Sequence, residues 1–240
     1  MTQMKDSAKS AEWVARVVAE NPIRKIMDAK GQWTGNILTC PVRLSFFNNS
    51  LHVAVAGKND DGTDKAPIFE VQALFPPCAN DQIGSVLLPI IDAKARQDFP
   101  QNVGPDGSLF GIRTPLRRQD ERQQYSGFTP GGFFLRATTQ YKPPVVDTAN
   151  NPIVDPSRAY PGVWALLSIN LFKYAMKVNK GLSFGLQAVM IVADDNKLAG
   201  GAVDTKTQFQ GVKIDGGFDP AKAFGASAAP PPPPPANVLI

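Results

Sequence analysis

The feature that most constrains the fold is an alternating stretch at residues 159–186. In its first half one face is entirely apolar, formed by Val163, Ala165, Leu167, Ile169 and Leu171. The other face mixes the aromatic residues Trp164, Phe172 and Tyr174 with polar side chains. Alternation of period two is typical of half-buried strands, and Asn-Lys-Gly at 179–181 predicts a turn into a second strand. We therefore expect a hairpin with one core face and one face that either packs or meets a ligand.

Similar but shorter patterns occur elsewhere in the chain. Strands are predicted at 36–47, 51–56, 68–75 and 133–142, and helical spacing at 83–91 contains Pro89, which predicts a kink or two short helices. At least five strands in hairpins with one inserted helix predict a mainly β fold. A small closed barrel of the OB type fits this order of elements, and a β-sandwich is the alternative.

The two ends of the chain differ from this central region. Residues 1–35 predict a helical arm of two helices that meet at Asn21-Pro22, where the first stops and the second starts. Residues 202–240 contain six consecutive prolines and predict a flexible, proline-rich tail. The expected organisation is an arm at 1–35, a β-domain at 36–201 and a tail at 202–240.

Catalytic and metal-binding signatures are absent from the sequence. The single histidine, His52, lies in a predicted strand, and the two cysteines fit no metal-ligand spacing. The sequence therefore predicts neither an enzyme nor a metal or cofactor site. No run of about 18 apolar residues is present, and the first residues lack a signal-peptide core, so we expect a soluble protein of a reducing compartment.

Positive charge is concentrated in one segment. Between Arg113 and Lys142 there are six basic and two acidic residues, so this segment carries the whole formal net charge of +4. A basic stripe on a near-neutral body favours a polyanionic partner, and a solvated face is the alternative.

Aromatic residues are interleaved with these basic residues, and the outer face of the long strand adds more. Single-stranded nucleic acid offers phosphate charge and exposed base faces, which a basic groove with aromatic rings complements. The candidate contact residues are Arg43, Arg113, Arg117, Arg118, Arg122, Tyr125, Phe134, Arg136, Tyr141, Lys142, Trp164, Phe172 and Tyr174.

Three segments, taken in order, resemble a known family. They are PVRLSFFN (41–48), TPLRRQDERQQYSGFTPGGFFLRATTQYKPPVVD (114–147) and DPSRAYPGVWALLSINLFKYAMKVNKGLSFGLQAVMIVADDNKLAGG (155–201). In their order and spacing they are similar to phage single-stranded-DNA-binding proteins, a group related in fold to replication proteins of podoviruses. The resemblance covers roughly residues 36–201.

The resemblance implies an OB-fold that coats single-stranded DNA in phage replication or recombination, without base specificity, in the cytoplasm of the infected bacterium. The alternatives are a phage structural or assembly protein and a single-strand annealing protein. Replication or recombination partners would dock on the C-terminal residues Val238, Leu239 and Ile240, and a homo-oligomer is a further expectation.

Overall fold

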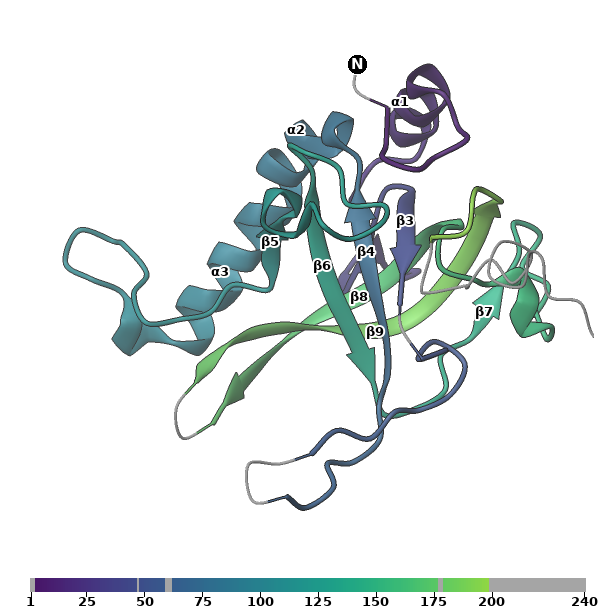
Figure 1. Cartoon of the computed structure of the whole chain (residues 1–240). Helices are drawn as coiled ribbons and strands as arrows, with labels where there is room; N and C mark the ends of the chain where they lie inside the picture. Colours follow the sequence, from purple (N-terminus) through teal and green to yellow (C-terminus); the bar gives the residue numbers. More distant parts are fainter. Residues whose placement is uncertain (1–2, 47, 59–61, 177–178, 199–240) are drawn as a thin grey trace, which may run out of the picture. The chain divides into compact units, whose positions relative to one another are not determined.

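A computed structural model describes residues 3–46, 48–58, 62–176 and 179–198 of the chain (Figure 1). Its central strands are β3 (Val42–Ser45), β4 (Phe69–Phe75), β6 (Phe133–Thr139), β8 (Trp164–Ala175) and β9 (Lys180–Ala193). They pair in the order β8-β3-β4-β6-β9, and β9 pairs again with β8. This closure makes a five-stranded barrel, which confirms the expected OB-like architecture over the sandwich.

Shorter elements extend the barrel. β1 (Arg24–Met27) and β2 (Trp33–Leu38) form a hairpin on β8, β5 (Leu116–Arg118) lies along β6, and β7 (Val145–Val146) lies along β9. Single 3₁₀ turns occur at η1 (Pro77–Ala79), η3 (Pro100–Asn102), η4 (Gln119–Arg122) and η5 (Pro156–Arg158).

The long hairpin formed by β8 and β9 supplies much of the core, as the alternation predicts. Leu167, Ile169 and Phe184 are fully buried, and the two strands stay antiparallel across their length. The register between the strands shifts at Ser168/Ile169. On β9 the side chains that point into the core are therefore even-numbered up to Leu186 and odd-numbered from Val189.

The other face of β8 divides into a covered and an open part. Near its start, Trp164 is fully buried and its ring packs edge-on against Trp13 at a centroid distance of 5.6 Å. Trp13 belongs to α1 (Ala11–Glu20), which Ser10 caps by accepting a hydrogen bond from the Trp13 amide. Near the end of β8, Phe172 remains 40% exposed. This face of β8 therefore packs against the protein near the start of the strand and remains open to a ligand near its end.

The helical segment between β4 and β6 follows the chain without a break. It runs through α2 (Asn80–Gln82), the π-helical η2 (Ile83–Leu87) and α3 (Leu88–Asp98). The π turn ends at Leu87, two residues before Pro89, whose missing N–H and bulky ring disfavour a regular α-helix there. The irregularity expected at Pro89 is thus a local widening of the helix.

Three predictions of secondary structure are wrong. The second helix of the arm is instead β1, because Asp28 accepts hydrogen bonds from Lys30 and Gln32 and turns the chain into β2. The strand predicted at 36–47 is divided at Pro41 into β2 and β3. Residues 51–56, which the structure describes in full, form no strand and contain only a single bridge, from Val55 to Ile68.

Candidate functional site

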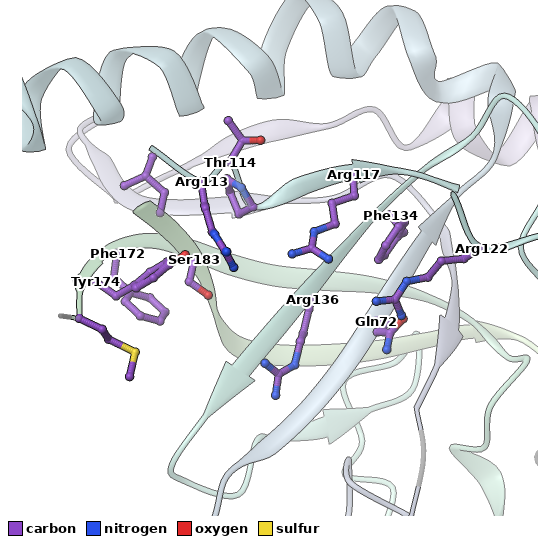
Figure 2. Close-up of a pocket in the computed structure, with 13 residues that line it drawn as sticks. Gln72, Arg113, Thr114, Arg117, Arg122, Phe134, Arg136, Phe172, Tyr174 and Ser183 are labelled. Atoms are coloured by element: carbon purple, nitrogen blue, oxygen red, sulfur yellow. The ribbon is translucent and has the colours of Figure 1, made fainter. Parts of the chain in front are cut away.

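A groove of about 580 Å³ lies between the barrel wall, β5 and the tip of the long hairpin (Figure 2). Its lining combines four arginines with aromatic, polar and small apolar side chains. The lining residues are Gln72, Arg113, Thr114, Pro115, Arg117, Arg122, Phe134, Arg136, Phe172, Tyr174, Met176, Leu182 and Ser183.

The floor of the groove follows from the register of three strands. Phe134 on β6 lies opposite Arg117 on β5, and two residues later Arg136 lies opposite Gln72 on β4. Residues two apart on a strand share a face, so this register gathers the four side chains on one surface. Figure 2 shows them projecting from neighbouring strands.

A buried glutamine holds the β5 end of the floor. Gln119 is fully buried, and its Nε2 donates to the carbonyls of Phe75 and Phe133 at 2.7 and 2.6 Å. Its Oε1 accepts from the Thr129 amide at 2.7 Å. These bonds fix the η4 turn to the barrel, and Arg117 and Arg122 on either side of Gln119 are positioned by it.

A backbone junction ties Arg113 to the hairpin. The Arg113 amide donates to the Lys180 carbonyl at 3.0 Å, and the Arg113 carbonyl accepts from the Leu182 amide at 3.1 Å. Between them, a Cβ on Gly181 would lie 2.3 Å from the Arg113 carbonyl oxygen. Only glycine permits this approach, so Gly181 is required by its packing against Arg113.

Positive charge dominates the groove. No carboxylate occurs among the lining residues, all of which belong to the described part of the chain. Arg136 is partly neutralised from the rim, where its Nε donates to Glu70 at 3.0 Å. The Arg122 guanidinium lies over the Phe134 ring at 5.1 Å, and Arg113 and Arg117 are exposed. Such a surface suits a polyanion.

Two aromatic rings stand at the hairpin end of the groove. Phe172 and Tyr174 project from the same face of β8, and Ser183 on β9 is the register partner of Phe172 (Figure 2). Rings beside guanidinium groups can stack on flat ligands whose charged parts the arginines bind.

Seven of the thirteen sequence-predicted contact residues line this groove. They are Arg113, Arg117, Arg122, Phe134, Arg136, Phe172 and Tyr174. Phe134, however, is only 3% exposed, because it packs against Phe128 and lies beneath Arg122. The prediction of an outward, stackable ring at Phe134 is therefore wrong, although its edge contributes to the floor.

Four further predicted residues lie outside the groove lining. Arg118 pairs with Asp120 and stacks over Phe133 at 4.7 Å. Tyr125 adjoins Arg122, with 6.0 Å between ring centroid and guanidinium carbon. Tyr141 is 81% exposed, and Lys142 next to it is exposed as well. Tyr125 thus adjoins the groove at Arg122 without lining it, and the other three side chains lie outside the lining.

Arg43 and Trp164 require a correction, because both are fully buried. Arg43 donates to the carbonyls of four residues and pairs with Asp195 at 3.8 Å. The four carbonyls belong to Lys5, Asp6, Gly162 and Asn196. The Trp164 indole N–H donates to Asp195 at 2.7 Å. This Arg43 network, comprising Arg43, Trp164 and Asp195, fastens the N-terminal segment and the residues that follow β9 to the barrel.

Several lining residues do not follow from the sequence patterns. Gln72, Ser183 and Thr114 are uncharged and non-aromatic, so a search for basic and aromatic side chains does not select them. Only the position of Gln72 in the sequence could have indicated its role, because it is the polar residue in the middle of the strand predicted at 68–75. The expected docking residues Val238, Leu239 and Ile240, and the tail at 202–240, lie outside the described residues.

Membrane-spanning helices and metal clusters are both absent from the described part of the chain. Within these residues, no helix is long and apolar enough to cross a membrane. Over the same residues, no group of three or more His, Cys, Asp or Glu side chains could hold a metal ion. His52 contacts the Ala159 carbonyl at 2.7 Å and the ring of Phe46, which is a structural setting.

Comparison with known proteins gives one family and one fold. The sequence model described as "Enterobacter phage Enc34, ssDNA-binding protein" matches residues 35–218. No curated protein matches the chain. The structure is similar to that of the single-stranded DNA-binding protein from bacteriophage Enc34 in complex with ssDNA, with 20% identity, a TM-score of 0.51, and coverage of 69% of this chain and 90% of that one.

Further structures of the Enc34 protein are similar to the same degree. A second structure of the single-stranded DNA-binding protein from bacteriophage Enc34 has 18% identity and a TM-score of 0.51 over 78% of this chain and 99% of that chain. Its C-terminal truncation has 17% identity and a TM-score of 0.52 over 75% and 99%. At these identities the likeness supports the fold.

Proposed function

Because the chain belongs to the family of the Enterobacter phage Enc34 ssDNA-binding protein, we propose that it binds single-stranded DNA in the arginine-lined groove, without sequence specificity. The observation that carries the site is the convergence of four guanidinium groups with Phe172 and Tyr174 on a surface whose lining has no carboxylate. Each component has a physical counterpart in single-stranded DNA.

The arginines bind the phosphates. Arg113, Arg117 and Arg136 are exposed along the groove, and Arg122 lies at its far end in Figure 2. Each phosphate contact releases condensed counterions, so binding weakens as salt rises. Guanidinium groups suit this role because their planar donors match two phosphate oxygens at once.

Phe172 and Tyr174 bind the bases. A base stacked on an aromatic ring contributes about 1–3 kcal/mol, and every base has a π-face, so stacking tolerates any sequence. Phe172 is 40% exposed and thus retains a face for a ligand. Backbone charge and ring stacking together account for affinity without base discrimination.

The proposed biological role is that of a phage single-stranded-DNA-binding protein. The protein coats and protects single strands during phage DNA replication or recombination, in the cytoplasm of the infected bacterium, and catalyses no reaction. Replication or recombination proteins dock on its C-terminal residues, including Val238, Leu239 and Ile240. Deletion of these three residues tests the docking by loss of partner capture with unchanged DNA affinity.

The test of the groove is the salt dependence of binding to a fluorescently labelled oligo-dT strand. The double variant Arg113→Ala/Arg117→Ala is expected to flatten the slope of log affinity against log salt by about 0.7 for each phosphate that the variant no longer binds. Labelled DNA is required because the three tryptophans lie outside the groove lining.

A matched control removes the same charge elsewhere. Arg24 and Lys30 are exposed on and after β1, outside the groove lining, and Arg24→Ala/Lys30→Ala should keep the wild-type slope. Equal flattening in both double variants would show that general charge, not the groove, drives binding. Absence of binding by the wild type at low salt would refute the function.

A further inference from the structure

Gln72 has an unusual position in the floor of the groove. It lies on β4 between Ser45 of β3 and Arg136 of β6, its register partners on either side. Its side chain lines the groove, yet the residue is only 8% exposed. Figure 2 places it at the Arg122 end, beside Phe134.

The amide oxygen of Gln72 has no hydrogen-bond partner. Among the described residues only three buried side-chain nitrogen or oxygen atoms lack a hydrogen-bond partner. Of these three, only Gln72 Oε1 belongs to a residue that lines the groove. The other buried glutamine, Gln119, has its Oε1 and Nε2 both satisfied by backbone groups. A buried acceptor without a donor is unfavourable. The oxygen is covered in the structure, and a turn of the side-chain amide brings it to the groove, where a ligand can supply the donor that the protein does not.

The chemistry of DNA limits what that donor can be. Phosphate and deoxyribose within a strand offer acceptors only, so the N–H groups of a single strand belong to its bases. On the Watson–Crick edge of every base an N–H stands next to an acceptor, and a primary amide carries the complementary pair. Rotation about the last torsion of glutamine, which is broad and two-fold, exchanges Oε1 and Nε2 and accommodates either order.

We propose that Gln72 is a base-contacting residue whose amide oxygen accepts an N–H from the edge of a base while Arg136 and Arg122 bind the adjacent backbone. This inference rests on the proposed function and adds to it a polar contact with the base edge. The contact is compatible with any base, so it contributes affinity for unpaired bases without sequence preference. A paired base, whose edge is already occupied, cannot make it.

The experiment compares oligo-dT with an otherwise identical strand in which every thymine carries a methyl group at N3. The methyl group removes the N–H donor and keeps the charge and the stacking face. The wild type should bind the methylated strand about two- to tenfold more weakly. Gln72→Met, similar in size and without polar atoms, should bind oligo-dT more weakly than wild type and bind both strands equally.

Controls separate the contact from other causes. Ser183→Ala alters another lining residue and should keep the wild-type discrimination between the strands. Gln72→Met should unfold at or above the wild-type temperature, because it removes an unpartnered buried atom.

Equal binding of both strands by the wild type would overturn the inference alone. Full discrimination by Gln72→Met would also overturn it, since the methyl group would then act by bulk. Failure of the wild type to bind either strand would overturn the proposed function itself.

Discussion

The Arg43 network and the groove contain the same kinds of residue, which are buried in the network and largely exposed in the groove. Both combine arginine with aromatic rings on or beside the barrel. In the network, Arg43 is fully buried and its donors are directed at backbone carbonyls and Asp195. In the groove, Arg113 and Arg117 are exposed, and Phe172 keeps a free face.

The difference shows what makes a cation available to a ligand. A guanidinium whose donors are already bound to carbonyls holds the fold together, whereas one at the surface has donors to offer a phosphate. The same applies to the rings, because Trp164 packs on Trp13 and donates its N–H to Asp195. Residue type alone does not distinguish these roles.

The largest expected effect is on stability. Arg43→Met leaves Asp195 buried without its cation and four carbonyls without their donor, so we expect a loss of about 3–5 kcal/mol in the free energy of unfolding. Urea unfolding followed by tryptophan fluorescence measures this, because Trp13 and Trp164 lie in contact. Arg117→Met is the matched variant and should stay within about 0.5 kcal/mol of wild type. Similar losses in the two variants would abolish the distinction between the regions.

The next effect concerns the rings. Phe172→Ala and Tyr174→Ala should each weaken oligo-dT binding by about 1–3 kcal/mol without changing the salt slope, because stacking involves no charge. Titration with labelled DNA at two salt concentrations measures both quantities. Tyr141→Ala is the control, since this ring is 81% exposed and outside the groove lining. A loss for Tyr141→Ala equal to that for Phe172→Ala would move the stacking site.

The third prediction uses pH. Burial raises the pKa of Asp195, but hydrogen bonds from Ser7, Ala8, Trp164 and Asn196 outweigh burial and hold the pKa below its ordinary value of 3.8. The carboxylate therefore stabilises the fold above about pH 4, and this contribution is lost as the pH falls through the lowered pKa of the folded state.

Asp195→Asn removes that contribution, and we expect a loss of about 1–2 kcal/mol at neutral pH. The difference in urea midpoint between wild type and variant should be constant from about pH 5 to 7 and shrink in acid below about pH 4. A difference that grows with acid would mean that the network does not stabilise the charged form. DNA affinity at neutral pH should be unchanged in the variant.

The smallest effect comes from the rim of the groove. Glu70 neutralises Arg136, whose side chain is 54% exposed, and exposed ion pairs are worth about 0.2–1 kcal/mol. Glu70→Gln should therefore raise affinity for oligo-dT a few-fold at low salt. Asp92→Asn makes the same change of charge in the Asp92–Arg96 pair of α3, outside the groove lining, and should have less effect. Equal gains would indicate net charge rather than release of Arg136.

Part of the molecule could be predicted because its pattern is local. The alternation in β8 and β9 specifies which side chains face the core, and the basic segment from Arg113 to Lys142 indicates a polyanion. By contrast, the spacing of Ile23, Ile26 and Met27 predicts a helix, and the segment forms β1 instead because it pairs with β2, which in turn pairs with β8.

Local sequence patterns were enough to predict the long hairpin, the mainly β class and the concentration of charge, because each depends on residues close together in the chain. Tertiary structure decided which arginines are available. Arg43 and Arg136 both alternate with apolar residues on their strands. The N-terminal segment and the residues that follow β9 cover Arg43, and nothing comparable covers Arg136 among the described residues. Alternation reveals the face on which a side chain lies, and only the folded chain determines what lies over that face.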